Sequence, residues 1–259
     1  MVPLLGFTAF TGLAVGILSG LLGLGGGIIL APVLLYLPPA LGLGPLDMRT
    51  VAGLTMTHAL FASLSAAWRH QQNRMICWPL ARWMGSTIFI ASFVGATASK
   101  AVSTDILQAV FALLAFVAGV LMVLPQKEFT SARSNASFSR PLAVGIAVAI
   151  GALGGLVGQG GSFLLIPSIA SLLQIPLRIA VGTNLPIVAL ASLSGFLGKL
   201  MTHQVPVEIG LALVLGAVPG AQIGSILSRR APTPFLRGLL AIIIILVAVR
   251  MGYQTLQSR

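Results

Sequence analysis

The stretch "SGLLGLGGGIILAP", Ser19–Pro32, decides the fold expected for this chain. It is apolar enough for the interior of a lipid bilayer, but five of the eight residues from Gly20 to Gly27 are glycine. In a helix interior each glycine is about 1 kcal/mol less favourable than alanine. Non-helical backbone is tolerated at membrane depth only where it is buried in protein or lines a water-filled cavity. The stretch therefore predicts a broken helix inside a membrane protein.

The composition of the chain also indicates a membrane protein. Of the 259 residues, 57% are hydrophobic and 7% are charged, and the mean hydropathy is +1.03. Soluble domains usually carry about 25% charged residues, so this chain cannot cover a water-facing surface. The net charge of +11 does not indicate nucleic acid binding, because the basic residues are spread singly between long apolar runs. They are typical of topology determinants in cytoplasmic loops, and they also create a positive potential that attracts anions.

The distribution of charge divides the chain into hydrophobic units. Residues 1–46 and 141–177 contain no charged residue, and each run is much longer than the roughly 20 helical residues that cross a bilayer. Because each run has a glycine-rich stretch in its middle, each is expected to be a broken helix, or a span plus a re-entrant piece. The remaining units have the length of a single span: 50–68, 83–99, 106–126, 179–198, 209–228 and about 236–252.

The two halves of the chain resemble each other in sequence. "GLLGLGGGIILAP" (Gly20–Pro32) aligns with "GLVGQGGSFLLIP" (Gly155–Pro167) with seven identities in thirteen positions, and Arg49–Ser65 aligns with Arg178–Ser194 in the same order. The chain is thus divided into a first repeat, a polar linker and a second repeat, at residues 1–125, 126–141 and 142–259. The expected fold is an all-α polytopic membrane protein with about eight helical units in two four-unit repeats, each starting with a glycine-broken helix.

The loop charges bear on whether these repeats are inverted or parallel. In the first half the loop after the second unit is basic and the next loop is not, whereas in the second half the order is reversed. In the first half the basic loop has Arg69, Arg74 and Arg82, and the next loop has only Lys100. In the second half the first of these loops has only Lys199, and the next region has Arg229, Arg230 and Arg237. Basic loops face the cytoplasm, so equivalent loops are expected on opposite sides, as in an inverted repeat. An inverted repeat needs an odd number of crossings per half, so one of the four units must be re-entrant or cross differently. The glycine-containing unit is the candidate for this role. A parallel arrangement of the repeats stays open.

The two glycine stretches are the predicted substrate site. A helix that begins after a break presents roughly half a positive charge and open N–H donors, which suit an anion, and glycine lets the backbone approach a ligand. Unwound helices at the midplane, one per repeat, are typical of secondary transporters. The candidate binding residues here are Gly25, Gly26, Gly27, Gln159, Gly160, Gly161 and Ser162. The alternative is helix packing through small residues, to which we assign Gly12, Gly16, Gly20, Gly151, Gly155, Gly216, Gly220 and Gly224.

Polar residues in the units that follow the breaks complete the predicted site. Thr55, Thr57 and His58 lie in one apolar span, and Thr183 and Asn184 lie at an equivalent depth in the other half. Polar groups in a membrane should face protein or a cavity. They are expected either to line the pathway and bind substrate or to form hydrogen bonds between helices. His58 is a candidate for anion binding or proton coupling, or for a structural role.

The residue types that are absent from the spans weaken several classes of function. No span has a central Asp or Glu, no His-Glu-x-x-His motif occurs, and Cys77 is the one cysteine. These absences weaken cation transport and protease chemistry, so the chain is predicted not to be an enzyme, and no metal or cofactor is expected. Arg49 and Arg178, at aligned starts of their units, are expected either to steer an anion or to anchor the helices.

At these motifs the sequence resembles the TauE/SafE family, the sulfite exporter family of bacterial membrane proteins. The resemblance rests on the glycine motif, its echo in the second half, the "RTVAGLT" and "RIAVGTN" starts, and eight units in two halves. The matching positions are Gly23, Gly25, Gly26, Gly27, Pro32, Gly158, Gly160, Gly161 and Pro167. The resemblance implies a multi-pass inner-membrane carrier that exports small anions such as sulfite and organosulfonates. Ser162 stands where the first motif has its last glycine, so the two stretches are not chemically identical.

The function expected from these observations is export of a small anion, such as sulfite, an organosulfonate or a related sulfur oxyanion, through a midplane site of glycine-rich breaks. A passive anion channel and a membrane scaffold or assembly factor without transport are the alternatives. The expected partners are a small anionic substrate and the lipid bilayer of the bacterial inner membrane. A homodimer is left open, and no nucleic acid partner is expected.

Overall fold

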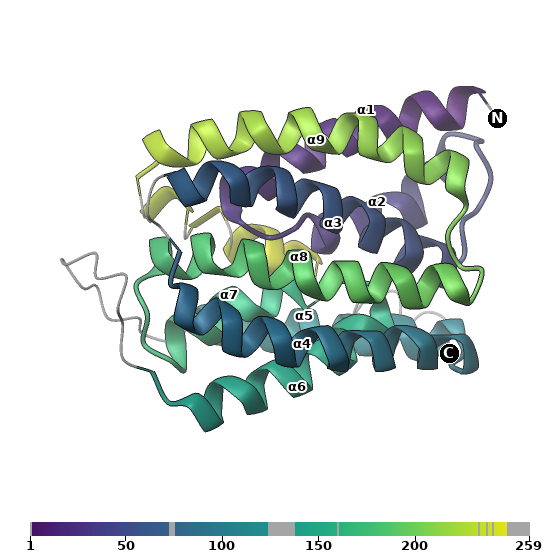
Figure 1. Ribbon diagram of the computed structural model, residues 1–259. Helices are drawn as coiled ribbons and strands as arrows, with labels where there is room; N and C mark the ends of the chain where they lie inside the picture. Colours follow the sequence, from purple (N-terminus) through teal and green to yellow (C-terminus); the bar gives the residue numbers. More distant parts are fainter. Residues whose placement is uncertain are drawn as a thin grey trace.

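The structure is a computed structural model, and it describes residues 2–72, 76–123, 138–159, 161–232, 234–236, 238–239 and 241–247. All regular secondary structure in these ranges is helical (Figure 1). The elements are α1 (Val2–Leu22), α2 (Gly27–Ala40), α3 (Met48–Gln72), α4 (Trp78–Ala98), the 3-10 turn η1 (Ser99–Ala101), α5 (Thr104–Val123), α6 (Arg140–Val157), α7 (Ser162–Ser171), α8 (Leu177–Met201) and α9 (Val207–Arg230). A further apolar helix covers Pro234–Val247.

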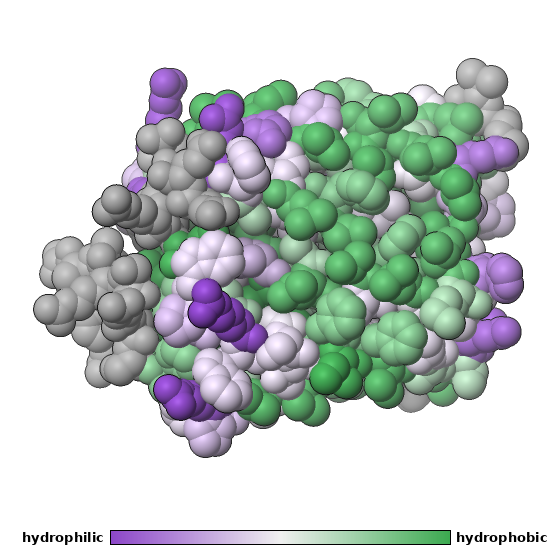
Figure 2. Space-filling view, in the orientation of Figure 1, coloured by the Kyte–Doolittle hydropathy of each residue, from purple (hydrophilic) through white to green (hydrophobic). Residues whose placement is uncertain are grey.

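The helices form a multi-pass membrane protein, as predicted. Within the described ranges, 6 helices are long and apolar enough to cross a membrane, namely α1, α3, α5, α6, α8 and α9. The 14 residues of α2 and the 10 of α7 are too few, since at 1.5 Å per residue they extend about 21 and 15 Å against a hydrocarbon core of about 30 Å. Figure 2 shows a broad hydrophobic belt, with the hydrophilic side chains gathered toward the two ends of the helices.

The predicted break is present in each of the two long uncharged runs. α1 stops at Leu22 and α2 starts at Gly27, whereas α6 stops at Val157 and α7 starts at Ser162. Left-handed backbone conformations cost side-chain-bearing residues roughly 1–2 kcal/mol each, and glycine avoids this cost. The glycines with positive φ in the breaks are Gly23 (71°), Gly25 (65°), Gly26 (82°), Gly158 (80°) and Gly161 (71°). The glycine run therefore ends one helix and starts the next within four residues.

The long helices run in alternating directions between the two ends of the molecule. In Figure 1, α1, α3 and α9 run from right to left, whereas α4, α6 and α8 run from left to right. The central pair α3 and α8 is antiparallel, because Gly53 near the start of α3 lies beside Gln204 after α8, and Thr183 near the start of α8 lies beside Cys77 after α3. α1 packs along α9, and α6 packs along α4, on the two flanks of this pair.

Small residues form the seams between the flanking helices, as predicted for their spacing. On α1, a Cβ at Gly16 would lie 2.7 Å from the carbonyl oxygen of Ala217 on α9, and from α9 a Cβ at Gly224 would overlap the carbonyl of Ile17. On α6, a Cβ at Gly155 would overlap the carbonyl of Ser92 on α4 in the same way. The helix backbones are therefore in direct contact, which supplies the close packing that drives helix association in membranes.

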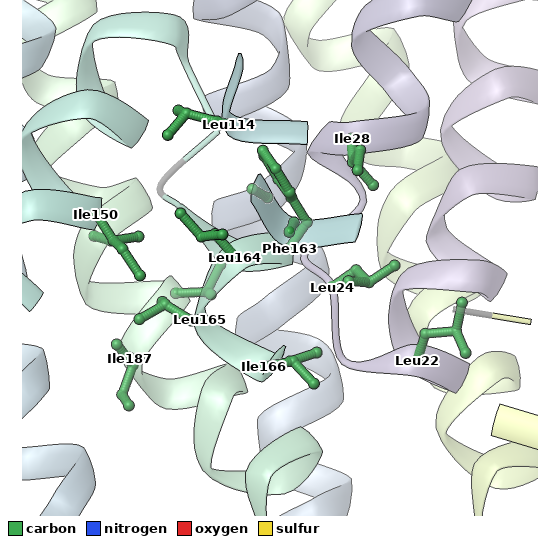
Figure 3. Close-up of a cluster of buried hydrophobic side chains, with 14 of the residues drawn as sticks. Leu22, Leu24, Ile28, Leu114, Ile150, Phe163, Leu164, Leu165, Ile166 and Ile187 are labelled. Carbon is green, nitrogen blue, oxygen red and sulfur yellow. The ribbon is translucent and has the colours of Figure 1, made fainter. Parts of the chain in front are cut away.

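An apolar cluster surrounds the two breaks. Figure 3 shows Leu24 and Ile28 of the first break and of α2 facing the start of α7, where Phe163 and its neighbours lie. Phe163 also contacts Phe111 of α5, with the ring centroids 5.9 Å apart. All ten residues of α7 are buried. The short helices after the breaks are thus enclosed by protein, which is the condition for irregular backbone at membrane depth.

The start of α6 differs from the predicted boundary of the linker, and the starts of α3 and α8 are held by the two aligned arginines. Residues 126–137 of the predicted linker lie outside the described residues, and α6 begins at Arg140 within the linker because Pro141 suits the first turn of a helix. Arg49 donates from Nη2 to the carbonyl of Val102 at 2.8 Å, and Arg178 does the same to Ala231 at 2.8 Å. Both arginines therefore anchor the starts of α3 and α8.

The seam between α1 and α9 predicts a large effect of Gly224→Val. The added side chain must displace the backbone of α1, and overpacking of this kind costs about 1–3 kcal/mol or more. We expect a lower thermal unfolding midpoint in detergent and a several-fold lower yield of monodisperse protein. Gly145→Val on α6 is the matched control, because a Cβ there meets nothing within 4 Å. Equal behaviour of the two variants would contradict the packing role.

Candidate functional site

The two glycine breaks meet each other inside the protein. Asn184 on α8 donates from Nδ2 to the carbonyl of Gly23 at 2.7 Å and to the carbonyl of Ser162 at 3.1 Å, so one amide group touches both breaks. A Cβ on Gly25 would lie 3.5 Å from Cβ of Ser162, and a Cβ on Gly27 would overlap the carboxamide of Gln159. The two predicted cradles therefore lie against each other.

The helices that follow the breaks hold the site together by reciprocal hydrogen bonds. Thr55 on α3 donates to the carbonyl of Gly158 in the second break, and Asn184 on α8 donates to the carbonyl of Gly23 in the first. Thr55 and Asn184 occupy aligned positions in the two halves, as do Gly23 and Gly158. Each half thus supplies a donor to a backbone carbonyl that the other half leaves without a helical partner.

His58 fixes the first break against α1. Its Nδ1 lies 3.3 Å from the carbonyl oxygen of Gly25, and its Nε2 lies 3.3 Å from the carbonyl oxygen of Gly12. The ring is fully buried, and a Cβ on Gly26 would lie 2.5 Å from Cε1. A neutral imidazole donates only one hydrogen bond, so just one of these two carbonyls is satisfied by it at a time.

Polar atoms without partners are concentrated where the breaks meet. Both carboxamide atoms of Gln159, the hydroxyl of Ser162 and Oδ1 of Asn184 have no hydrogen-bond partner among the described residues, and all three side chains are fully buried. A buried polar group left unpaired costs about 1–3 kcal/mol. Such groups in native proteins call for an explanation, and a polar ligand or water that enters the site is one.

The backbone adds further donors to the same place. The N-caps of α2 and α7 are Gly26 and Gly161, and neither helix start has a side-chain cap. In these first turns the N–H groups of Ile29, Leu164 and Ser162 bond to nearby backbone carbonyls, which leaves those of Gly27, Ile28 and Phe163 as donors. The helix dipole places partial positive charge at the same ends. The junction of the breaks therefore combines backbone N–H groups with the carboxamide of Gln159 and the hydroxyl of Ser162. This donor set suits a small anion with several acceptor oxygens.

Some predicted site residues make their contacts elsewhere. Thr57 donates to the carbonyl of Gly53 in its own helix at 2.9 Å, and Thr183 accepts a hydrogen bond from the backbone N–H of Cys77 at 2.9 Å. These bonds support the structural alternative for both threonines. Gly160 lies outside the described residues.

Sequence reasoning overlooked Lys199. It was counted only as a loop charge, but its side chain is fully buried and Nζ donates to the carbonyl of Leu156, two residues before Gly158. Its position directly after Gly198 and the apolar unit 179–198 could have indicated that it belongs to the helix. α8 continues to Met201, so Lys199 lies within the helix.

The sequence profile of a known family covers this arrangement almost completely. The sulfite exporter TauE/SafE profile matches residues 8–251, which include both breaks and all the helices that hold them. The chain belongs to the TauE/SafE family. The resemblance read from the glycine motifs is therefore confirmed, and this TauE/SafE protein is a multi-pass membrane protein of a transporter family.

Relatives of this TauE/SafE protein carry equally general names. It is 26% identical over 268 residues to the probable membrane transporter protein YunE of Bacillus subtilis, covering 95% of this chain and 97% of the relative. It is 28% identical over 264 residues to a probable membrane transporter protein of Xylella fastidiosa, covering 97% and 96%. A probable membrane transporter protein of Haemophilus influenzae is 24% identical over 254 residues, covering 93% and 95%. No solved structure matches the chain.

The reciprocal bonds predict that Thr55→Val destabilises the protein. Valine has nearly the same shape but cannot donate to the carbonyl of Gly158, and hydrogen bonds between membrane helices are worth about 0.6 kcal/mol on average and up to about 1.7. We expect a loss of that size in unfolding by denaturing detergent. Thr57→Val, which removes a bond within one helix, serves as the control and should have the smaller effect. A larger effect of Thr57→Val would rule out the cross-half bond as the stabilising contact.

Proposed function

We propose that this protein exports a small sulfur oxyanion, such as sulfite or an organosulfonate, and binds it where the two glycine breaks meet. The observation that carries the proposal is the pair of buried, unpartnered donors at that junction, Nε2 of Gln159 and the hydroxyl of Ser162. The printed names of the relatives support transport and leave the substrate open. The family name supplies sulfite as the substrate class to test first.

The chemistry of the junction favours an oxyanion over a cation. A sulfite or sulfonate group has three oxygens that each accept hydrogen bonds, and the junction offers Nε2 of Gln159, the hydroxyl of Ser162 and the N–H groups at the starts of α2 and α7. Hydrogen bonds to charged groups are stronger than neutral ones, and they strengthen further in a low-dielectric interior. None of the break residues that the structure describes carries a negative side chain to repel an anion.

The course of the helices supports an inverted repeat. α1, α3 and α4 of the first half run opposite to their counterparts α6, α8 and α9 in the second half (Figure 1). α2 and α7 are shorter than a span, but the chain returns to its starting end after each glycine unit, since α1 and α3 start at one end and α6 and α8 at the other (Figure 1). The helices that follow then make the number of crossings per half odd, as inversion requires. The reciprocal bonds of Thr55 and Asn184 are related by the same exchange of halves. Movement of the two halves about this shared site is the proposed route to alternating access.

The charges at the two ends give the orientation in the membrane. One end, here called the arginine-rich end, carries Arg69, Arg82, Arg140, Arg178 and Arg230. The other, here called the acidic end, carries the described acidic residues Asp47, Asp105 and Glu208 together with the basic residues Arg49 and Lys100. Because basic loops face the cytoplasm, the arginine-rich end is proposed to be cytoplasmic.

This orientation predicts which introduced cysteines react from outside the cell. In a Cys77→Ala background, Ser103→Cys at the acidic end should react with a membrane-impermeant maleimide in intact cells. Ser139→Cys at the arginine-rich end should react only after permeabilisation. Both serines are exposed, so accessibility within the protein is matched. The reverse pattern would invert the proposed topology.

Counterflow in proteoliposomes tests the proposed function. Vesicles with purified protein are preloaded with sulfite or sulfoacetate, and uptake of the labelled compound is followed. We expect saturable exchange that is accelerated by the internal substrate, whereas a passive channel gives no such acceleration. Gln159→Leu and Gly27→Ala should lower exchange at least tenfold, because the first removes the unpaired carboxamide and the second displaces it.

Gln108→Leu on α5 is the control, since it removes a half-buried carboxamide away from the breaks. If Gln159→Leu and Gly27→Ala both show exchange at the wild-type rate, the substrate does not bind at the breaks. Absence of exchange with any sulfur oxyanion, in protein shown to be folded, would refute the proposed substrate class.

A further inference from the structure

Lys199 is a buried cation whose partners are all neutral. Its Nζ donates to Oγ of Ser99 at 2.6 Å, to Oε1 of Gln204 at 3.1 Å and to the carbonyl of Leu156 at 3.2 Å. The side chain is 0% exposed. In the part of the chain that the structure describes, no carboxylate forms an ion pair with it. The hydrogen bonds of this lysine therefore all go to neutral acceptors, and the charged groups that act on it from farther away are Arg49 and Asp47.

A structural role alone accounts poorly for this charge. A lysine near a helix C-terminus can bond the last carbonyls and favour the helix dipole, and Leu156 is in the last turn of α6. Such a cap works from the surface, where the ammonium keeps its water. Removing a charge from water is costly, and neutral hydrogen bonds recover only part of that cost. Full burial without a counter-ion points to an anion that visits the site.

The position of the cluster fits a step on the route of an anion. Leu156 is two residues before Gly158, the glycine whose carbonyl is bound by Thr55 and which precedes Gln159. Ser99 follows α4, and Gln204 lies between α8 and α9, so the cluster lies on the side of the break that faces the acidic end. Burial excludes a lipid head group, which would need an open surface.

We propose that Lys199, with Ser99 and Gln204, forms a second oxyanion site between the glycine breaks and the acidic end. Its ligand class is a sulfonate or sulfite anion, and in this respect the inference rests on the proposed function. The ammonium supplies the charge that the break residues lack. Nε2 of Gln204 and the hydroxyl of Ser99 now bond to each other's side chains, so an anion that arrives takes the place of these bonds. An anion that leaves the breaks toward the acidic end passes to this cluster.

Two substitutions separate an anion site from a structural cap. Lys199→Met keeps the length of the side chain and removes the charge, and Gln204→Glu places a carboxylate where Oε1 lies 3.1 Å from the ammonium. If the cluster binds anions, both variants should lower sulfoacetate counterflow at least tenfold, and Gln204→Glu should do so without lowering the thermal unfolding midpoint. Lys199→Arg should retain more exchange than Lys199→Met. If the lysine is only a cap, Gln204→Glu should leave exchange intact, and that result overturns the proposal.

Lys100→Met is the matched control for charge, because Lys100 is exposed and adjacent to Ser99. An equal loss of exchange in Lys100→Met and Lys199→Met would indicate a general surface potential and would also overturn the proposal. Anion binding is measured separately, as the rise in unfolding midpoint that sulfoacetate gives in detergent. We expect Lys199→Met to reduce that rise.

This binding readout separates the two proposals. If sulfoacetate stabilises the wild-type protein but not Lys199→Met, and the wild type shows no exchange, the second site is supported and transport is refuted. Exchange that persists in Lys199→Met, together with an unchanged stabilisation by sulfoacetate, would retain transport and refute the second site. No stabilisation and no exchange in the wild type would refute both.

Discussion

The fold depends on one constraint, which is that every backbone polar group at membrane depth needs a partner within the protein. A helix satisfies its own backbone, whereas a break releases carbonyl and N–H groups that lipid cannot bind. Here the released carbonyls of Gly23 and Gly158 are bound by Asn184 and Thr55 from the opposite halves. His58 and Asn184 also bind carbonyls of their own halves, but these two carbonyls are bound from the opposite half. The two halves must therefore fold against each other, and the breaks are brought together as a consequence.

The same constraint explains the arrangement of the remaining helices. The short helices α2 and α7 cannot span a membrane, so they are stable only when surrounded by protein. The central helices α3 and α8 are the most buried of the membrane-length helices, at 72% and 78% of their apolar windows. The outer helices reach them closely because glycine seams bring the helix backbones into contact. Small residues at the periphery and glycines at the centre thus have different tasks, close packing in one case and helix interruption in the other.

The sequence predicted those features that depend on local chemistry. A run of glycines in an apolar segment predicts a break wherever it occurs, and the helix stops at Leu22 and Val157 agree with it. The contact between the breaks was beyond prediction, because it joins Asn184 to Gly23 across 161 positions of the chain. The same limit applies to Lys199: its charge suggested a loop, and only the packing of α4, α6 and α8 around it reveals a buried ammonium. Periodicity and composition specify elements, but they do not specify which polar groups become neighbours.

The two breaks share a backbone but differ in side chains, and this difference shapes the site. Leu24 and Gly27 in the first break correspond to Gln159 and Ser162 in the second. The first break is fixed by His58 and packs with apolar Leu24, whereas the second brings the unpaired carboxamide and hydroxyl. Gly27 leaves the room that Gln159 occupies, since a Cβ there would overlap it. The absence of a side chain at Gly27 and the presence of Gln159 beside it are therefore complementary, and the two breaks together form one asymmetric polar junction.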